Sequence, residues 1–590
     1  MQIIYYTIMV LTGFTIGLSL VALSKEQKKN WIPYAFILGN AFVILVVFWM
    51  SNCFSQGMNS WARILLIILL LAAITIIVRE RKTVHDYLKN IKRKDVLCVI
   101  VSYIAGLLPL SIYILWKAQF PYCDGYTYIC ISDYLMEHGY NVGIDVQEII
   151  HHPWLSQMHL YQTRHFRIGA QMLLAFASSI FGVKFSLELF LPVCGLSIML
   201  CGMATWMFVS NISGSDNNIE LYSIVIFCFN IPIVQWCIMY GFLPQILGSA
   251  FCLAVLSLIF TAKNWKKNAY MEILQAAVVT AVFALTYNEM LPFFVIVIVG
   301  FFIGEIIIKK KESIDVIKNI CIIGAISICM ILTYVPGMVS AIVSQLGAIV
   351  GWNQNKDIIT YMAQIFSVIP PEYNLHEKQV GAPVLAAEII TVVVTIMLYN
   401  GYRKSDKNIK YYYGLCTVPY IMIFIYFVFF TENPFIGGTT NTWSVFKLVQ
   451  YYAVLLLPFI AIFFVQSLKK YPKIILSSIM VFVIFNVYQG INYTKQLAGD
   501  MKMYVGTETP LQEYYNLYYE YGNCQQTVEL INVPIKHRQM ITYFLKDTEL
   551  VSDWSTDDYF SIIPLGEEEA QICLYYDNAD INATAGLVQK

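Results

Sequence analysis

Charged residues are scarce in this sequence. They make up 13% of its 590 residues, whereas an ordinary soluble domain carries about 25%. The hydrophobic share is 58% and the mean hydropathy is +0.62, which excludes a chain built mainly of soluble domains. Net charge is also missing, because 38 basic and 38 acidic residues cancel, so no overall field attracts nucleic acid. The composition therefore predicts a polytopic membrane protein with no nucleic-acid partner.

Other familiar features are missing as well. The 14 cysteines form no disulfide framework and no zinc-binding spacing, since most of them sit inside apolar runs such as "SIMLCGMATW". There is no glycine-rich phosphate loop, and the loops expected in the cytoplasm are too short to build one, which argues against a soluble nucleotide-sugar site. The N-terminal segment has no basic leader and no small-residue cleavage site, so we expect a retained span rather than a signal peptide.

Apolar runs recur along most of the chain. A bilayer core needs about 20 apolar residues per helix. A weaker run at 168–182 would reverse the topology of everything after it if it crossed, so we expect it to be re-entrant or interfacial. The sequence otherwise predicts about fourteen transmembrane helices, near 3–23, 31–50, 62–79, 96–115, 184–210, 219–237, 241–262, 270–287, 289–308, 317–338, 383–400, 411–430, 445–467 and 472–492.

Lysine and arginine residues orient these helices. When the spans are counted off, six basic segments fall on one face, and they begin at residues 25, 79, 263, 309, 402 and 469. Basic residues in short loops mark the cytoplasmic side, so both termini are expected outside. The outer face then holds loops at 116–183 and 339–382, a short loop at 431, and a tail at 493–590. The tail alternates strand-like runs with a helical one, which predicts a small α/β domain.

Asp124 lies just beyond the fourth expected span, at the start of the first long outer loop. A carboxylate fixed at the rim of a helix bundle is well placed to act on a substrate whose head lies at the lipid interface. The alternative role is structural, because Asp124 precedes a helical stretch that runs to Gly139 and aspartate is a good helix N-cap. The two roles are compatible, since a capping side chain is rigidly held.

These features resemble the GT-C superfamily of integral membrane glycosyltransferases. The resemblance rests on the many apolar spans, the position of Asp124, interfacial helices in its loop, the segment "RHFRIGAQMLLAFASSIFG" that follows, and the tail outside. It implies a GT-C-like fold and inverting transfer of a hexose or pentose from a polyprenyl phosphate or pyrophosphate. Asp124 would correspond to the catalytic aspartate. Gly125 follows it where protein mannosyltransferases have a glutamate, so the resemblance does not extend to that branch.

The resemblance also implies a division of the chain into domains, a cellular location and a set of partners. Residues 1–95 would be three additional N-terminal helices with a cytoplasmic loop, 96–492 the GT-C-like core, and 493–590 the extracytoplasmic domain. The active site would face outside, and sparse Asn-x-Ser/Thr sites favour a bacterial inner membrane. The expected partners are a polyprenyl-linked sugar donor, a glycan, lipid or protein acceptor, and membrane lipids, in cell-surface glycan assembly.

Basic residues at the outer face are candidate ligands of the donor phosphate. Lys447 enters the membrane about one turn into its helix, with Gln450 and Tyr451 at helical spacing from it. Its alternative role is to snorkel to the surface. Arg164 and Arg167 are the other two candidates, with lipid-headgroup anchoring as the alternative.

Further polar residues are candidates for contacting an acceptor or a metal. Glu289 and Tyr287 lie at an outer turn between two spans, and His165 belongs to a loop that holds five of the eight histidines. A tight turn and hydrogen-bonded loop histidines are the alternatives. His537 and Trp554 in the tail are candidates for acceptor recognition. The sequence leaves the need for a divalent metal open.

Two other functions fit the same composition. An O-antigen polymerase or ligase would also act outside on lipid-linked sugars, but its large functional loop comes late in the chain, whereas the longest loop here follows the fourth span. A flippase or transporter for lipid-linked sugars would carry related halves and mid-membrane charges. Here the charges within spans are few, and polar residues gather at the outer rim.

Overall fold

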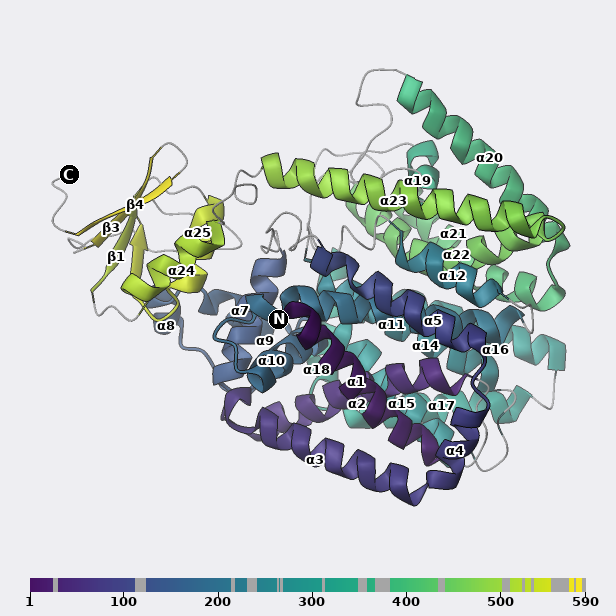
Figure 1. The fold of residues 1–590 in the computed structure, drawn as a ribbon, viewed down its shortest axis with the longest axis horizontal. Helices are drawn as coiled ribbons and strands as arrows, with labels where there is room; N and C mark the ends of the chain where they lie inside the picture. Colours follow the sequence, from purple (N-terminus) through teal and green to yellow (C-terminus); the bar gives the residue numbers. More distant parts are fainter. Residues whose placement is uncertain are drawn as a thin grey trace.

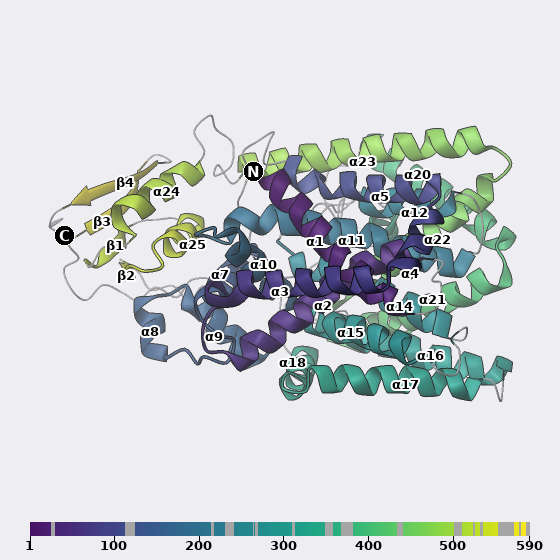
Figure 2. The same cartoon turned by 60° about the horizontal axis from the view of Figure 1, so that its bottom comes forward.

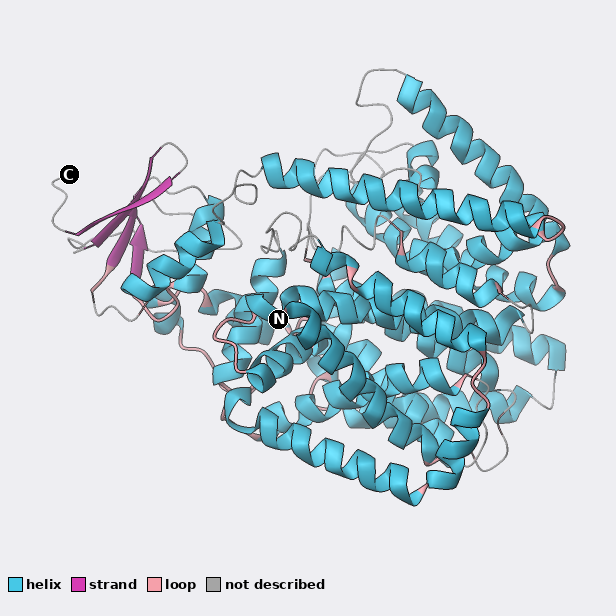
Figure 3. Cartoon of the chain, in the orientation of Figure 1, coloured by secondary structure: helices cyan, strands magenta, loops and turns pink. Residues whose placement is uncertain are grey.

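The computed structural model is a large helical bundle with a small β-sheet near the C-terminus (Figures 1 and 3). It describes residues 1–24, 30–111, 124–213, 218–230, 241–262, 265, 269–309, 313–347, 358–366, 382–432, 441–500, 510–522, 526–531, 535–552, 572–577 and 580–585. Parts of the expected outer loops at 339–382 and 431 therefore lie outside the described residues.

Within these ranges, nine helices are long and apolar enough to cross a membrane. This confirms the prediction of a polytopic helical membrane protein. The nine are α1 (Gln2–Ala22), α2 (Trp31–Cys53), α3 (Met58–Arg79), α5 (Arg93–Gly106, with the span continuing to Ser111), α11 (Leu187–Ser213), α14 (Leu243–Thr261), α16 (Leu291–Lys309), α21 (Lys407–Phe429) and α22 (Thr442–Leu468).

Counting only the residues that the structure describes, the remaining expected spans coincide with helices that do not singly meet this standard. They are α12 (Ile219–Cys228), α15 (Tyr270–Thr286), α20 (Ala382–Lys404), α23 (Pro472–Asp500) and the pair α17 (Ser313–Met330) and α18 (Val335–Gly347). The count of fourteen spans therefore stays a prediction.

The expected span at 317–338 falls on two helices, α17 and α18, which form either a broken span or a re-entrant loop, so this span stays a prediction. α17 and α18 are bent by 103° at the break between them. Pro336 lies in the first turn of α18, where the missing N–H of proline is tolerated and its fixed φ favours the start of a new helix. After the bend, α18 packs beside α9, an outer-loop helix.

The first long outer loop folds into short helices that pack onto the bundle. They are α7 (Asp124–Glu137), α8 (Val146–His151), α9 (Leu155–Arg164) and α10 (Gly169–Phe181). α10 covers the weak apolar run at 168–182 and has 13 residues, a length of about 20 Å. Because a hydrocarbon core is about 30 Å thick, α10 cannot cross it. It is buried against α7, α2 and α3 instead.

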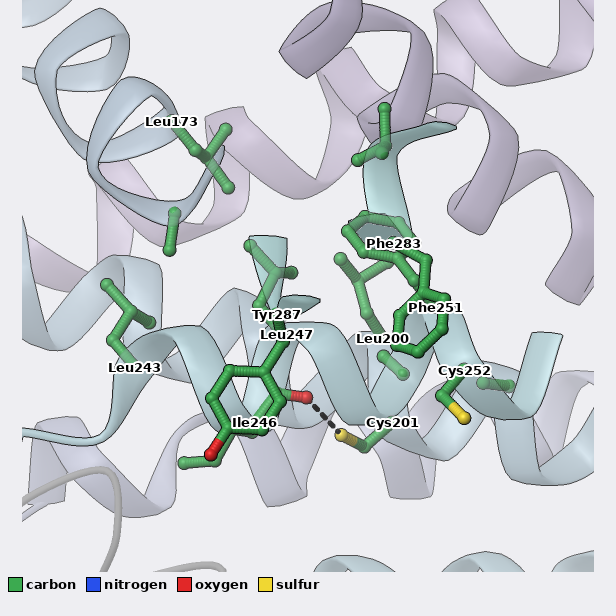
Figure 4. Close-up of a cluster of buried hydrophobic side chains, with 14 of the residues drawn as sticks. Leu173, Leu200, Cys201, Leu243, Ile246, Leu247, Phe251, Cys252, Phe283 and Tyr287 are labelled. Atoms are coloured by element: carbon green, nitrogen blue, oxygen red, sulfur yellow. Dashed lines mark hydrogen bonds between the residues drawn. The ribbon is translucent and has the colours of Figure 1, made fainter. Parts of the chain in front are cut away.

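The centre of the bundle consists of helices that are apolar on every side. α11 and α14 are almost entirely buried and pack against each other, with α15 beside α14. Figure 4 shows their interlocking side chains, and the thiol of Cys201 donates a hydrogen bond to the carbonyl of Ile246 at 3.3 Å. α2 also packs into this core, against α11 and α15. The N-terminal helices therefore belong to the same bundle as the helices after residue 96.

Two N-terminal helices approach each other unusually closely through glycine. A side chain at Gly17 would place its Cβ 1.7 Å from the carbonyl oxygen of Ala35, and one at Gly39 would place it 1.9 Å from that of Gly13. No residue larger than glycine fits at either position without a shift of backbone. Small residues at such crossings are typical of helix pairs in membranes.

The basic segments that the structure describes in full, at 79–94, 402–410 and 469–473, lie at the end of the bundle away from the β-sheet. α4 (Arg81–Lys89) stacks Tyr87 on Trp31, next to the first basic segment, and Lys404 donates to the carbonyl of Ser467 beside the last one. Both views place α4 and the turn between α22 and α23 far from the sheet, while α7 lies close to it (Figures 1 and 2). The outer-loop helices and the basic segments are therefore at opposite ends.

The C-terminal segment contains a four-stranded sheet in the order β2-β1-β3-β4. β1 pairs in parallel with β2 and β3, and β3 and β4 form an antiparallel pair. Its elements are α24 (Pro510–Tyr521), β1 (Val528–Ile531), α25 (Ile535–Phe544), β2 (Leu550–Ser552), β3 (Ile572–Asp577) and β4 (Asp580–Ala585). Strands and helix occur in the runs that suggested them, but α23 continues past the expected boundary at 493. An independent extracytoplasmic α/β domain stays a prediction.

Candidate active site

Asp124 is the first residue of α7, and its carboxylate is held by side chains. The hydroxyl of Tyr128, one helical turn further on, donates to Asp124 Oδ2 at 3.2 Å. Arg167 Nη2 lies 3.8 Å from the same oxygen. The side chain of Asp124 is 30% exposed, so this carboxylate is both fixed and reachable.

Arg167, in the turn between α9 and α10, joins Asp124 to a second carboxylate. Its Nη1 donates to Glu289 Oε1, and its Nη2 donates to the hydroxyl of Tyr128 at 2.9 Å. Glu289 lies in a short 3-10 helix, η2 (Asn288–Met290), between α15 and α16. The fork of donors on a guanidinium suits such a bridge, because its N–H groups have fixed directions. Only 14% of the Arg167 side chain and 18% of the Glu289 side chain are exposed.

Glu289, the second carboxylate, is itself held by a chain of hydrogen bonds. Tyr451 on α22 donates its hydroxyl to Glu289 Oε2 at 3.2 Å and lies 3.2 Å from the hydroxyl of Tyr287. The Tyr287 hydroxyl donates to Gln245 at 3.3 Å, and Gln245 donates to Gln450 at 3.3 Å. We call Asp124, Tyr128, Arg167, Glu289 and Tyr451 the Asp124 cluster. Its members come from α7, the turn between α9 and α10, η2 and α22, so packing of the whole bundle fixes its geometry.

Tyr287 supports the Asp124 cluster from within the core. Its ring packs on α14, where a Cβ at Gly248 would come within 2.3 Å of Tyr287 Cβ (Figure 4). The guanidinium of Arg167 lies 5.4 Å from the ring centroid. Tyr287 is 1% exposed, so its ring is buried behind Arg167, and contact of Tyr287 with an acceptor or metal stays a prediction.

Lys447 lies near the Asp124 cluster and is held by aromatic rings. Its Nζ is 4.2 Å from the ring centroid of Phe242 and 5.2 Å from that of Trp443. Such contacts stabilise an ammonium group in a fixed position. The charge of Lys447 also reaches Asp124, since it lowers the pKa of that carboxyl.

The environment makes Asp124 a stronger base than an ordinary aspartate. Burial raises the pKa of Asp124, and the charge of Glu289 adds to this effect, while Arg167, Lys447 and the hydrogen bond from Tyr128 lower the pKa only in part. Burial alone would lower the pKa of Arg167, but Glu289 outweighs it and keeps the guanidinium charged. A carboxylate with a raised pKa accepts a proton more readily at neutral pH.

The other expected site residues lie elsewhere. Arg164 is exposed at the end of α9, and no described contact joins it to the Asp124 cluster. His165 adopts a left-handed backbone with φ of 51°, its ring lies against Gly337 of α18, and its carbonyl accepts a hydrogen bond from Tyr334 at 3.4 Å; no described contact joins its ring to the cluster. His537 is in α25, where its side chain is not described, and Trp554 lies outside the described residues.

Some members of the site were not identified from the sequence. Tyr128 is one helical turn after Asp124, a spacing at which side chains meet, and that spacing could have identified it. Phe242 and Trp443 gave no such signal, because aromatic residues at span ends are ordinary interface anchors.

In the part of the chain that the structure describes, no group of three or more histidine, cysteine, aspartate or glutamate side chains could hold a metal ion. A role for a divalent metal therefore stays open. No protein-family model matches the chain, and no curated protein matches it either.

Proposed function

We propose that this protein is a membrane glycosyltransferase of the GT-C type, which transfers a sugar from a polyprenyl phosphate or pyrophosphate to an acceptor outside the cytoplasm. The observation that carries the proposal is the state of Asp124: a partly exposed carboxylate of raised pKa, aligned by Tyr128 and Arg167. α7, the helix that begins at Asp124, lies at the end of the bundle opposite the described basic segments (Figures 1 and 2). With those segments in the cytoplasm, the cluster faces outside.

Asp124 acts as the general base in this reaction. It accepts the proton of an acceptor hydroxyl while the hydroxyl oxygen attacks the anomeric carbon of the donor sugar. The bond from that carbon to the phosphate oxygen breaks, its electron pair leaves with the phosphate, and the configuration at the anomeric carbon inverts. The proton then passes from Asp124 to solvent, which returns the carboxylate to its starting state. Such general-base catalysis contributes about 10²- to 10⁴-fold to a rate.

The two basic residues near Asp124 have different roles. Arg167 is already paired with Glu289, so its task is to align Asp124 rather than to neutralise a ligand. Lys447 is held between Phe242 and Trp443 close to Asp124, and it stabilises the negative charge that develops on the leaving phosphate. Arg164 is too exposed to share this role unless the donor lipid reaches the end of α9.

Ionised groups elsewhere in the bundle favour an enzyme over a transporter. Lys94 pairs with Glu220 at 3.0 Å near the starts of α5 and α12, and Ser24 donates to Glu272 near the start of α15. These positions are at the basic end of the bundle rather than at mid-membrane, where transporters carry their coupling charges. These two buried pairs therefore lie at one end of the bundle and not along a path across the membrane.

The experiment uses the full chain in lipid nanodiscs and a panel of short-chain polyprenyl phosphates and pyrophosphates that carry hexoses or pentoses. Release of the unglycosylated lipid is measured by mass spectrometry, with membrane glycans added as acceptor and with water alone. We expect release from one class of donor, with a net inverted product. Movement of the intact donor between the leaflets of proteoliposomes without cleavage would contradict the proposal and indicate a flippase.

A further inference from the structure

A second ionic group is buried where the C-terminal segment meets α7. Lys546, just after α25, has a side chain only 1% exposed. Its Nζ lies 2.7 Å from Glu137 Oε1 and 3.5 Å from Asp133 Oδ2, both on α7. The side chain of Asp133 is 0% exposed. Burial alone would lower the pKa of Lys546, but the two carboxylates outweigh it and raise the pKa, so the ammonium stays charged.

Neighbouring groups stabilise both Lys546 and Asp133 in this contact. Trp154 donates its indole N–H to the carbonyl of Lys546 at 3.0 Å, and its ring centroid is 5.3 Å from the ammonium. The second oxygen of Asp133 accepts from the backbone N–H of Ser186 at 2.8 Å. A buried charge is retained only where partners such as these satisfy it. The site fixes one arrangement of the C-terminal segment against α7.

Aromatic packing extends the same contact. Phe185 lies 5.4 Å from Tyr543 and 4.7 Å from Phe544, measured between ring centroids, and both residues are on α25. Tyr543 accepts a hydrogen bond from the backbone N–H of Leu187 at 3.3 Å. The segment before α11, the helix α7 and the helix α25 therefore form one packed unit.

This unit holds α7 from the side opposite the Asp124 cluster. Asp133 follows Asp124 by nine positions, which at 3.6 residues per turn is about half a turn out of phase and about 13 Å along the axis. Asp124 and Tyr128 face Arg167, whereas Asp133 and Glu137 face Lys546. The helix is thus clamped between two ionic groups, one on each side.

We infer that Lys546 is a positioning residue that, through Asp133 and α7, sets the alignment of Asp124 for the transfer reaction. The inference rests on the proposed function and assigns the C-terminal segment a part in it. Loss of Lys546 leaves Asp133 buried without its partner, and either protonation of the carboxyl or a shift of α7 relieves this; both change the contact that holds α7 in place. A displacement of about 1 Å at a reacting group can lower a rate about 100-fold.

The test compares Lys546→Met with the double variant Lys546→Met and Asp133→Asn, both in the full chain in nanodiscs. The double variant removes the buried negative charge, while the amide oxygen of asparagine can still accept from the backbone N–H of Ser186. Lys184→Met is the matched control, because Lys184 forms an exposed pair with Asp547 at the same contact, with side chains 48% and 37% exposed. Surface pairs of this kind contribute little.

We expect Lys546→Met to lower kcat about 100-fold with the donor KM nearly unchanged, and we expect the double variant to recover most of the rate. Hydrogen–deuterium exchange at residues 124–130 should rise in Lys546→Met and return in the double variant. The control should change neither quantity. The exchange readout does not need sugar transfer, so inactivity of the unmodified protein on every donor would remove the proposed function while leaving the inference testable.

The result that would overturn the inference is increased exchange confined to residues 133–137 and the C-terminal segment, with kcat as in the unmodified protein. Lys546 would then only attach the tail. A Lys546→Met protein that fails to fold leaves the double variant decisive. If that variant folds with its tail attached and still shows increased exchange at residues 124–130, the coupling through α7 is contradicted.

Discussion

Replacing Glu289 with glutamine separates the charge of the second carboxylate from its shape. Glutamine keeps the size of the side chain and an oxygen that can accept from Arg167, but it loses the ion pair. Removing one partner of a buried pair costs about 3–5 kcal/mol. Because the two side chains are 14% and 18% exposed and one hydrogen bond survives, we expect a loss of about 1–2 kcal/mol in the free energy of unfolding.

The effect on activity follows from the pKa of Asp124. Glu289 raises that pKa and Arg167 lowers it, so the substitution removes a raising influence and leaves the guanidinium with Asp124 as its remaining carboxylate. The pKa of Asp124 therefore falls. Its acid limb in the profile of rate against pH should move to lower pH, and the plateau rate should drop about tenfold, or about 1.4 kcal/mol, because a weaker base is less effective.

The assay measures release of polyprenyl phosphate from the lipid-linked donor as a function of pH. Glu148→Gln is the matched control, since Glu148 is an exposed residue of α8 in the same outer loop and should leave the profile unchanged. An acid limb that moves to higher pH in Glu289→Gln would refute the reasoning, and so would an unchanged plateau rate.

Three further predictions concern other parts of the molecule. Lys447→Ala should lower turnover with the protein still folded and inserted, whereas Lys447→Arg should retain part of it because the charge survives in a different geometry; unchanged turnover in the alanine variant would leave only the snorkelling role. Gly17→Leu should abolish stable folding, measured as loss of the monodisperse detergent-solubilised protein, because the crossing of α1 and α2 has no room for a side chain; a well-folded variant would contradict the close approach. A thiol introduced near Lys407 should resist an impermeant reagent applied from outside, and labelling there would disprove the orientation.

The positions of the helices could be predicted from the sequence because each membrane helix must be apolar over about 20 residues and satisfy its own backbone. Hydropathy says nothing about direction, so the 103° bend between α17 and α18 was missed. Pro336 and Gly337 were the available signal, since proline favours a helix start. The high mean hydropathy of the whole run hid these two residues from a prediction based on hydropathy alone.

The site could be predicted only one residue at a time. Asp124, Arg167, Glu289 and Lys447 each stood out as a polar residue at the end of an apolar run. Their partnership is a matter of long-range packing, because Arg167 and Glu289 are 122 positions apart in the chain. Lys546 gave no signal at all, since a lysine after a short helix is expected to be solvated.

The most direct test of the account is Asp124→Asn. Asparagine is similar in shape to aspartate and can accept the hydrogen bond from Tyr128, but it cannot take a proton from an acceptor at neutral pH. Asp145→Asn is the matched control, because Asp145 caps α8 in the same loop through a 3.0 Å bond from Gln147 N–H, and asparagine caps a helix equally well.

Transfer of sugar from a polyprenyl-linked donor is measured for both variants in nanodiscs, alongside their thermal unfolding. The account predicts a folded, inserted Asp124→Asn protein whose transfer rate is lower by at least about 100-fold, and an Asp145→Asn protein with the rate of the unmodified chain. Transfer by Asp124→Asn at close to the unmodified rate would contradict the account, reduce Asp124 to a structural residue, and move the transporter hypothesis ahead.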